Sequence, residues 1–230
     1  MILAAGRGER MRPLSDAVPK PLLEAGGKPL VVWQIERLVA AGFADLVINV
    51  SHRAEAIVAR LGDGSRFGCT IRYSHEREPL EVAGGIATAR ELLGTGVALV
   101  VSGDLYAEYA YAELRERATA MAATSAPPHA HMVMVPNPPY HPAGDFGLVD
   151  GRLVLDGPER RTYGNIGLYR MELFAPLPQG VKLPMLPLYR DWIGRDWVTG
   201  ELYAGPWANV GTAEDLARLD RRLEHGTLAS

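Results

Sequence analysis

The chain has 230 residues, of which 47% are hydrophobic and 22% charged, and its formal net charge is -3. This composition is typical of a globular enzyme, and a weakly acidic chain has no general attraction for nucleic acids or anionic membranes. Its one cysteine, Cys69, excludes an internal disulfide, and no apolar run approaches the roughly 20 residues of a membrane span. We therefore predict a cytoplasmic protein that binds neither membrane nor nucleic acid.

The first predicted element is a short buried strand at residues 1–5, which breaks directly into the glycine turn Gly6-Arg7-Gly8. Glycines can take positive φ and leave backbone N–H groups uncovered, so this turn can cradle an anion. Arg10 and Lys20 follow and can supply positive charge. The pattern predicts a phosphate site at the start of the chain.

Dinucleotide-binding folds also open with two closely spaced glycines, but they require a third glycine and a helix that starts at once. Met11 occupies the third position here, and Pro13 follows before a helix can become established. The sequence therefore disfavours a dehydrogenase of the Rossmann type.

Strands and helices then alternate as far as Asp104. The apolar spacing predicts helices at 30–41, 54–61 and 86–93 and strands at 45–50, 69–73 and 97–101. Gly84 and Gly85 are predicted to form the turn before the third helix. Such alternation favours a parallel sheet with the ligand at the carboxyl ends of its strands, where the glycine turn and Asp104 both fall.

The remainder of the chain is predicted to be richer in strands. We expect helices at 109–123 and 183–193, strands at 131–135, 164–170 and 199–204, an extended proline-rich loop at 136–142, and a hairpin at 146–155 that turns at Asp150-Gly151. The last helix is predicted to begin at Thr212, whose hydroxyl can cap it. We find no linker or repeat, so one α/β domain over 1–230 is the simplest account.

The opening stretch LAAGRGERMRPLS, together with PKPLL after it, resembles the signature of the sugar-1-phosphate nucleotidylyltransferases, the nucleotide-sugar pyrophosphorylases. The resemblance extends from Leu3 to Leu216 through VSGD, WANVGT, FGLV and YGNIG. It implies a Rossmann-like, mostly parallel sheet flanked by helices, with a β-rich sugar-binding insertion. In that scheme 1–105 mainly binds nucleotide, 106–211 mainly binds sugar, and 212–230 forms a C-terminal helix.

The same resemblance implies that Arg10 and Lys20 are the catalytic residues. In nucleotidyl transfer the sugar-phosphate oxygen attacks the α-phosphorus in line with departing pyrophosphate, so positioning and charge neutralisation carry most of the rate. Arg10 would hold the β- and γ-phosphates, and Lys20 would reach the α-phosphate. The residues implied to bind the nucleotide are Leu3, Ala4, Ala5, Gly6, Gly8, Arg10, Pro79, Gly84, Gly85 and Gly103.

Asp104 is the first candidate ligand for Mg²⁺, because a hard carboxylate oxygen at the end of a strand can face the phosphates. The family's second ligand is the aspartate of W-x-D-x-G-T, and this chain has Asn209 at that position. An amide oxygen still coordinates Mg²⁺, but one negative charge is lost. We expect weaker metal binding in the absence of nucleotide, with activity retained.

The sugar side is implied to involve Gly147 of the FGLV segment and Asn165 of the YGNIG segment. Asn165 can bind sugar hydroxyls, and the alternative is an ordinary turn asparagine. The Glu-Lys-Pro block that many relatives place between these segments is absent. Arg160 and Arg161 lie there instead and are the candidate cations for the sugar phosphate or a sugar carboxylate.

Within the family, a short chain with LAAGRGERMRPL, GDGSRFG, EPLE and GDF most resembles the members that act in peptidoglycan recycling. This resemblance implies UTP and N-acetyl-α-muramate 1-phosphate as substrates. The alternative pair is GTP and mannose 1-phosphate, because those enzymes share nearly every motif. An alternative of another class is an inactive nucleotide-sugar binding module, with Asn209 marking the decay of the metal site. The oligomeric state is not predicted.

Overall fold

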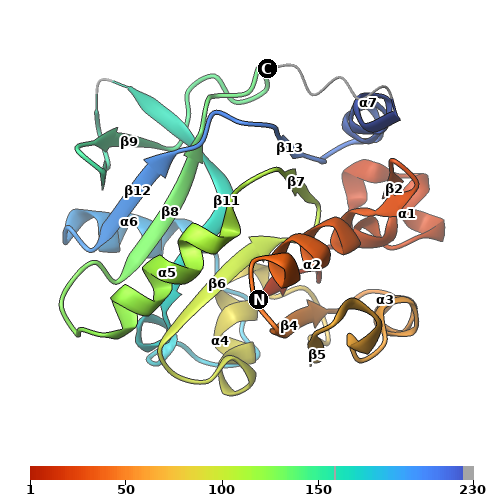
Figure 1. The fold of residues 1–230 in the computed structure, drawn as a ribbon, viewed down its shortest axis with the longest axis horizontal. Coiled ribbons are helices and arrows are strands. Elements are labelled where there is room, and N and C mark those ends of the chain that lie inside the picture. Colours follow the sequence, from red (N-terminus) through yellow and green to blue (C-terminus); the bar gives the residue numbers. More distant parts are fainter. Residues whose placement is uncertain (158, 225–230) are drawn as a thin grey trace.

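A computed structural model of the chain describes residues 1–157 and 159–224. A nine-stranded sheet forms the middle of the molecule, and helices cover both of its faces (Figure 1). The sheet consists of β1 (Ile2–Leu3), β4 (Asp45–Val50), β5 (Thr70–His75), β6 (Val97–Ser102), β8 (Ala130–Val135), β9 (Phe146–Val149), β10 (Arg152–Val154), β11 (Arg160–Arg170) and β12 (Val198–Leu202). Two small ribbons pair β2 (Glu24–Ala25) with β3 (Lys28–Pro29), and β7 (Leu105–Ala107) with β13 (Trp207–Asn209).

The α-helices of the described residues are α1 (Leu14–Ala17), α2 (Leu30–Ala40), α3 (Ala54–Leu61), α4 (Glu81–Leu93), α5 (Tyr111–Ala122), α6 (Leu186–Gly194) and α7 (Ala213–Glu224). Side chains of α2, α3 and α5 pack in one core cluster against the sheet. Those of α4 and α6 pack in a second cluster. The residues predicted for the C-terminal helix beyond 224 lie outside the described part of the chain.

The sheet is mixed, so the prediction of a mostly parallel sheet was wrong for its second half. Its order is β5-β4-β1-β6-β11-β8-β12-β10-β9. The first four strands are parallel, β11 is antiparallel to both β6 and β8, and only β8 and β12 are parallel beyond that point. Beyond β6, β9 and β10 are joined directly as a hairpin, and β11 returns between β6 and β8 in the opposite direction to both. The predicted α/β architecture itself is confirmed.

The start of α4 differs from the sequence prediction. The helix begins at Glu81, and Gly84 and Gly85 lie inside it and are buried, so no turn exists there. A Cβ on Gly84 would lie 2.2 Å from the Val181 carbonyl oxygen. Close packing between backbones thus explains Gly84, and it outweighs the low helix propensity of glycine, which costs about 1 kcal/mol per residue.

The ribbon of β7 and β13 was not predicted, and it determines the geometry of the site. Asn209 pairs with Leu105, and the Val210 N–H donates to the Asp104 carbonyl oxygen at 3.0 Å. Thr212 caps α7 as predicted, since its hydroxyl accepts a hydrogen bond from the Asp215 N–H at 3.2 Å. The antiparallel pairing brings two distant parts of the sequence to one edge of the molecule.

A polar cluster around the partly buried Glu201 of β12 predicts a measurable dependence of stability on acid pH. Hydrogen bonding from the buried His131 ring, then from Tyr109, and the charge of Arg117 lower the pKa of Glu201 from 4.5 to about 2. A depressed carboxyl pKa stabilises the fold above pH 4.5, and this stabilisation is lost as the pH falls through about 2.

Glu201→Gln is therefore expected to reduce the free energy of unfolding at pH 7 by about 1–2 kcal/mol. Urea unfolding from pH 7 to pH 2 checks this expectation, and the difference from the wild-type protein should shrink below pH 4.5. A difference that stays constant over the whole range would contradict the assigned role of Glu201.

Candidate active site

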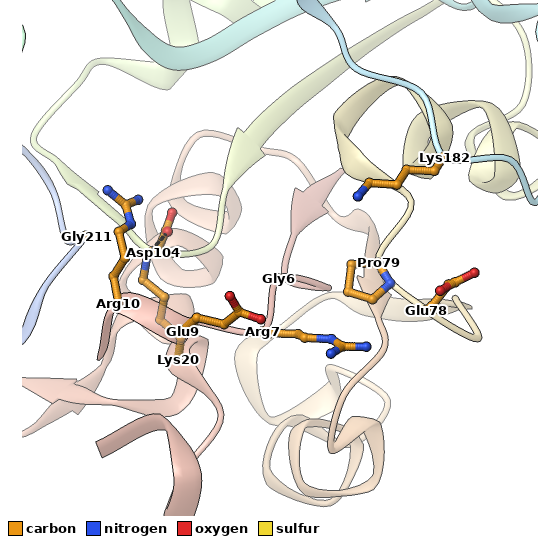
Figure 2. A pocket seen from close by; sticks show the side chains of 11 residues that line it. Gly6, Arg7, Glu9, Arg10, Lys20, Glu78, Pro79, Asp104, Lys182 and Gly211 are labelled. Atoms are coloured by element: carbon orange, nitrogen blue, oxygen red, sulfur yellow. Dashed lines mark hydrogen bonds and ion pairs between the residues drawn. The ribbon is translucent and has the colours of Figure 1, made fainter. Parts of the chain in front are cut away.

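A cavity of about 780 Å³ opens at the carboxyl ends of β1 and β6. It is lined by Gly6, Arg7, Gly8, Glu9, Arg10, Lys20, Glu78, Pro79, Asp104, Lys182 and Gly211. Figure 2 shows Arg10, Lys20 and Asp104 at one side of the cavity, Lys182, Pro79 and Glu78 at the other, and Arg7 between them. Four basic residues line a single cavity although the whole chain is acidic, so the attraction for phosphate is local.

The glycine turn has the open backbone that an anion site requires. A Cβ on Gly6 would have no atom within 4 Å. Gly8 has φ +65°, and a Cβ there would lie 2.9 Å from the Lys20 Cβ. The prediction of positive φ is thus confirmed for Gly8, whereas Gly6 is not in that conformation. Gly8 also allows the close approach that holds Lys20 beside the turn.

Lys20 and Asp104 form an ion pair on the wall of the cavity. The Lys20 ammonium contacts Asp104 Oδ2, and the exposed fractions of the two side chains are 11% and 26%. Lys20 lies at the start of a 3-10 helix that follows Pro19, and Pro21 fixes the backbone on its other side. Both predicted groups therefore face the same cavity, and each neutralises the other before any ligand is present.

Arg10 lies on the same wall, in the 3-10 helix that follows Gly8. A Cβ on Gly211 would be 3.5 Å from Arg10 Nη1, so Gly211 leaves room for the guanidinium. Arg10 and Gly211 also line a neighbouring cavity that includes Asn209. Arg10 therefore connects the space that contains Asp104 with the space that contains Asn209.

The two predicted metal ligands are brought together by the pairing of β7 with β13. Asp104 directly precedes β7, and Asn209 is the last residue of β13. Asn209 lines the neighbouring cavity together with Tyr140. Its amide oxygen can act as a metal ligand.

One carboxylate and one amide fit Mg²⁺, which keeps waters and takes further ligands from substrate phosphates. No cluster of three or more histidine, cysteine or acidic side chains that could hold a metal exists among residues 1–157 and 159–224. A metal that needs a complete cage of protein ligands would not fit the described residues. The donor set is suited to an ion that arrives with a nucleotide.

The other residues expected to bind the nucleotide divide into two groups. Pro79 lines the cavity, on the opposite side from Lys20. Leu3, Ala4, Ala5, Gly84, Gly85 and Gly103 do not line it. Gly103 packs closely on β1, where its N–H donates to the Leu3 carbonyl oxygen at 2.8 Å. Gly103 therefore acts through its packing on β1.

Of the residues expected on the sugar side, only Asn165 lines a second cavity, which has a volume of about 360 Å³. Asn165 lines it together with Asn209, and Asn165 has φ +58° at an irregular point of β11. A non-glycine residue in this conformation is uncommon and is often found at functional sites. Gly147 is buried in β9 against Val154 and does not line this cavity.

Arg160 and Arg161 are not brought to either cavity, so the structure does not support them as phosphate-binding cations. The Arg160 guanidinium donates to the Asp145 carbonyl oxygen, and that of Arg161 pairs with Glu159. Both guanidinium groups are therefore already bound to nearby groups of the protein.

Lys182 lines the main cavity and was missed by the sequence analysis. It lies on the segment before α6, and its Nζ is 3.5 Å from Glu81 Oε1. Backbone hydrogen bonds anchor the segment to α4: the Leu183 N–H donates to the Leu80 carbonyl at 3.0 Å, and the Gly84 N–H donates to the Leu183 carbonyl at 3.2 Å. Gly84 thus acts indirectly, by letting the segment that carries Lys182 approach.

Comparison with known proteins extends these observations. The family model described as "Nucleotidyl transferase" matches residues 1–153. N-acetylmuramate alpha-1-phosphate uridylyltransferase of Neisseria meningitidis is 43% identical over 218 residues, which cover 92% of each chain. Mannose-1-phosphate guanylyltransferase of Mycobacterium tuberculosis is 29% identical over 245 residues, covering all of this chain and 66% of that protein.

Solved structures of low sequence identity share the fold. A putative glucose-1-phosphate thymidylyltransferase from Bacillus anthracis, in complex with a sucrose, has a TM-score of 0.83 at 20% identity and covers 96% of this chain and 93% of its own. HddC from Yersinia pseudotuberculosis, complexed with GMP-PN, has a TM-score of 0.75 at 19% identity and covers 96% and 97%.

Proposed function

Because the chain belongs to the nucleotidyl transferase family, we propose that it transfers a uridylyl group from UTP to N-acetyl-α-muramate 1-phosphate and releases pyrophosphate. That it is a sugar-1-phosphate nucleotidyltransferase follows from the family. The observation that carries the choice of substrates is the 43% identity to the Neisseria enzyme over 92% of both chains. The natural role would then be in peptidoglycan recycling.

In the proposed mechanism a phosphate oxygen of the sugar phosphate attacks the α-phosphorus of UTP in line with the departing pyrophosphate. The open backbone at Gly6 and Gly8 and the Arg10 guanidinium bind the β- and γ-phosphates, and Lys20 neutralises charge that develops at the α-phosphate. Mg²⁺ bound by Asp104 and Asn209 would neutralise phosphate charge and help to orient the two substrates. No protein nucleophile is required.

For the phosphate of the sugar substrate we propose Lys182 in place of Arg160 and Arg161. Lys182 lines the main cavity on the side away from Lys20. Its ion pair with Glu81 is exposed, so the Lys182 ammonium can leave Glu81 and bind a phosphate instead. Lys182→Met is expected to raise KM for the sugar phosphate about tenfold, because a hydrogen bond to a charged group is worth roughly 1.5–3 kcal/mol. Lys28→Met is the matched control, because Lys28 pairs with Glu36 and does not line the cavity. An unchanged KM in Lys182→Met would refute this role.

Asn209→Asp tests the second proposed metal ligand. Restoring a carboxylate adds a negative charge beside Asp104, so the Mg²⁺ concentration for half-maximal turnover is expected to fall about 3- to 10-fold. Asn209→Ala should raise that concentration instead. Titration of turnover with Mg²⁺ at saturating substrates distinguishes the variants, and identical Mg²⁺ dependence in all three proteins would show that Asn209 is not a ligand.

The main experiment is a pyrophosphate-release assay of four nucleoside triphosphates, each paired with four sugar phosphates: those of N-acetylmuramate, N-acetylglucosamine, mannose and glucose. We expect kcat/KM for UTP with the muramate substrate to be at least about tenfold higher than for any other pair, a difference of roughly 1.4 kcal/mol. A preference for GTP and mannose 1-phosphate would favour the second candidate, which the Mycobacterium relative supports. Absence of turnover would favour an inactive binding module.

We further propose that 1–230 works as one nucleotidyltransferase domain, with 1–105 mainly on the nucleotide side and 106–211 mainly on the sugar side. The single nine-stranded sheet, to which both parts contribute strands, supports one domain. The division is supported by the cavities, because most residues that line the main cavity precede 105, whereas those that line the second cavity follow it. Cytoplasmic location stays a prediction; Cys69 is buried and has no disulfide partner. Among the described residues no helix has both the length and the apolar character of a membrane span.

A further inference from the structure

A chain of buried polar groups lies behind the nucleotide cavity. The Ala4 N–H donates to Asn49 Oδ1 at 2.9 Å, and Asn49 Nδ2 donates to Glu76 Oε1 at 2.7 Å. The Leu80 N–H then donates to Glu76 Oε2 at 2.9 Å. The exposed fractions of Asn49 and Glu76 are only 3% and 6%, so neither side chain can touch a ligand in the cavity.

The two ends of this hydrogen-bond network lie next to two opposite walls of the cavity. Ala4 lies two residues before Gly6, where the glycine turn begins, and Leu80 directly follows Pro79 on the opposite wall. The middle of the chain comes from two neighbouring parallel strands, because Asn49 is on β4 and Glu76 directly follows β5. The spacing of the walls is therefore fixed through side chains that no sequence motif identifies.

Gly85 provides the space for these groups. A Cβ on Gly85 would lie 2.8 Å from Glu76 Oε1 and 3.0 Å from Asn49 Nδ2. Burial raises the pKa of Glu76, while the hydrogen bonds from Asn49 and Leu80 oppose that shift. A buried acidic group is costly unless its partners are in place, so such a network favours one arrangement of the segments that it joins.

We propose that Asn49 and Glu76 are positioning residues that fix the distance between the glycine turn and the Pro79 wall, and so set the affinity for the nucleotide. The inference rests on the proposed function, because it concerns the nucleotide side of that site. It assigns the two residues no contact with the substrate. Their effect is expected on the KM for the nucleoside triphosphate and not on the KM for the sugar phosphate.

The direction of each hydrogen bond gives a sharp test. In Glu76→Gln an N–H group faces another donor at Asn49 or, after an amide flip, at Leu80. In Asn49→Asp two carboxylates face each other. The double variant Asn49→Asp/Glu76→Gln satisfies every group again, since the introduced carboxylate accepts from both Ala4 and the introduced amide, whose oxygen accepts from Leu80.

Steady-state kinetics of the three variants, at pH 8 and a temperature at which circular dichroism shows each to be folded, test the proposal. Each single variant is expected to raise KM for UTP at least about tenfold, with KM for the sugar phosphate within about twofold. The double variant should return KM for UTP to within about threefold of the wild-type value. Glu201→Gln is the control, because it also replaces a carboxylate by an amide and destabilises the fold, but at a position that does not line the cavity. It should leave the KM for UTP and the KM for the sugar phosphate unchanged.

The inference is overturned if the KM for UTP of the single variants is as close to the wild-type value as that of Glu201→Gln. It is also overturned if the KM for UTP of the double variant is as high as that of the more impaired single variant. Failure of the proposed function is read separately, in the wild-type protein, as a preference for another triphosphate or as absence of turnover. With another preferred triphosphate the same comparison is made with that nucleotide. Without turnover, calorimetric affinities for UTP replace KM, and the same pattern of loss and rescue is required.

Discussion

Asp104→Asn is expected to lower kcat/KM by about 10³-fold, or roughly 4 kcal/mol of transition-state stabilisation. The Asp104 carboxylate faces the cavity, and it is in contact with Lys20. The substitution keeps the shape of the side chain but removes the charge that attracts both a divalent cation and the Lys20 ammonium. This carboxylate would hold the metal that neutralises phosphate charge and orients the two substrates. The loss of activity should therefore appear in kcat as well as in kcat/KM.

Asp220→Asn is a matched control for that prediction. Asp220 lies on α7, where it accepts a hydrogen bond from the Gly26 N–H at 2.7 Å, and it does not line the cavity. The control should keep kcat/KM within about threefold of the wild-type value, because surface changes of this kind are small. Pyrophosphate release measured with both variants decides the matter, and a loss below tenfold in Asp104→Asn would argue against a metal or electrostatic role.

Local sequence patterns predicted the elements whose structure depends on near neighbours. The strand at 45–50 and the helix at 54–61 have the bounds that their apolar spacing indicated. The glycine turn, Lys20 and Asp104 were also identified, and the fold places them together. The glycine turn and Asp104 lie at strand ends, and Lys20 lies between two prolines, so at each position the composition changes abruptly along the chain.

The features that were missed depend on contacts between distant segments. The strand at 207–209 is short, and only its pairing with 105–107 makes it a strand. Arg160 and Arg161 carry the positive charge that a phosphate site needs, but their guanidinium groups are bound to Asp145 and Glu159. The proposed role of Lys182 depends on Gly84, because the missing side chain of this glycine lets the backbone at Val181 approach. No local pattern contains such information, because each case is decided by packing.

Lys20→Met is expected to change catalysis and metal binding in opposite directions. Its loss should lower kcat/KM by about 10²- to 10³-fold, because the charge that develops at the α-phosphate loses a preorganised partner. In the absence of nucleotide, however, the Lys20 ammonium contacts the Asp104 carboxylate that would bind the metal. Lys20→Met removes this ammonium, which competes with Mg²⁺ for Asp104. The variant without nucleotide should therefore bind Mg²⁺ several-fold more tightly.

The opposite signs separate this mechanism from a loss of folding, which would weaken both activity and metal binding. Calorimetric titration with Mg²⁺ alone and steady-state turnover are measured on the same preparation, with Lys28→Met as the control for removing one lysine. Weaker metal binding in Lys20→Met would mean that Lys20 holds Asp104 in place and does not compete for it. Unchanged turnover would remove Lys20 from the catalytic site. Tighter metal binding with slower turnover is the combination that the ion pair predicts, because a group that blocks the metal in the empty site is needed on phosphate once the nucleotide enters.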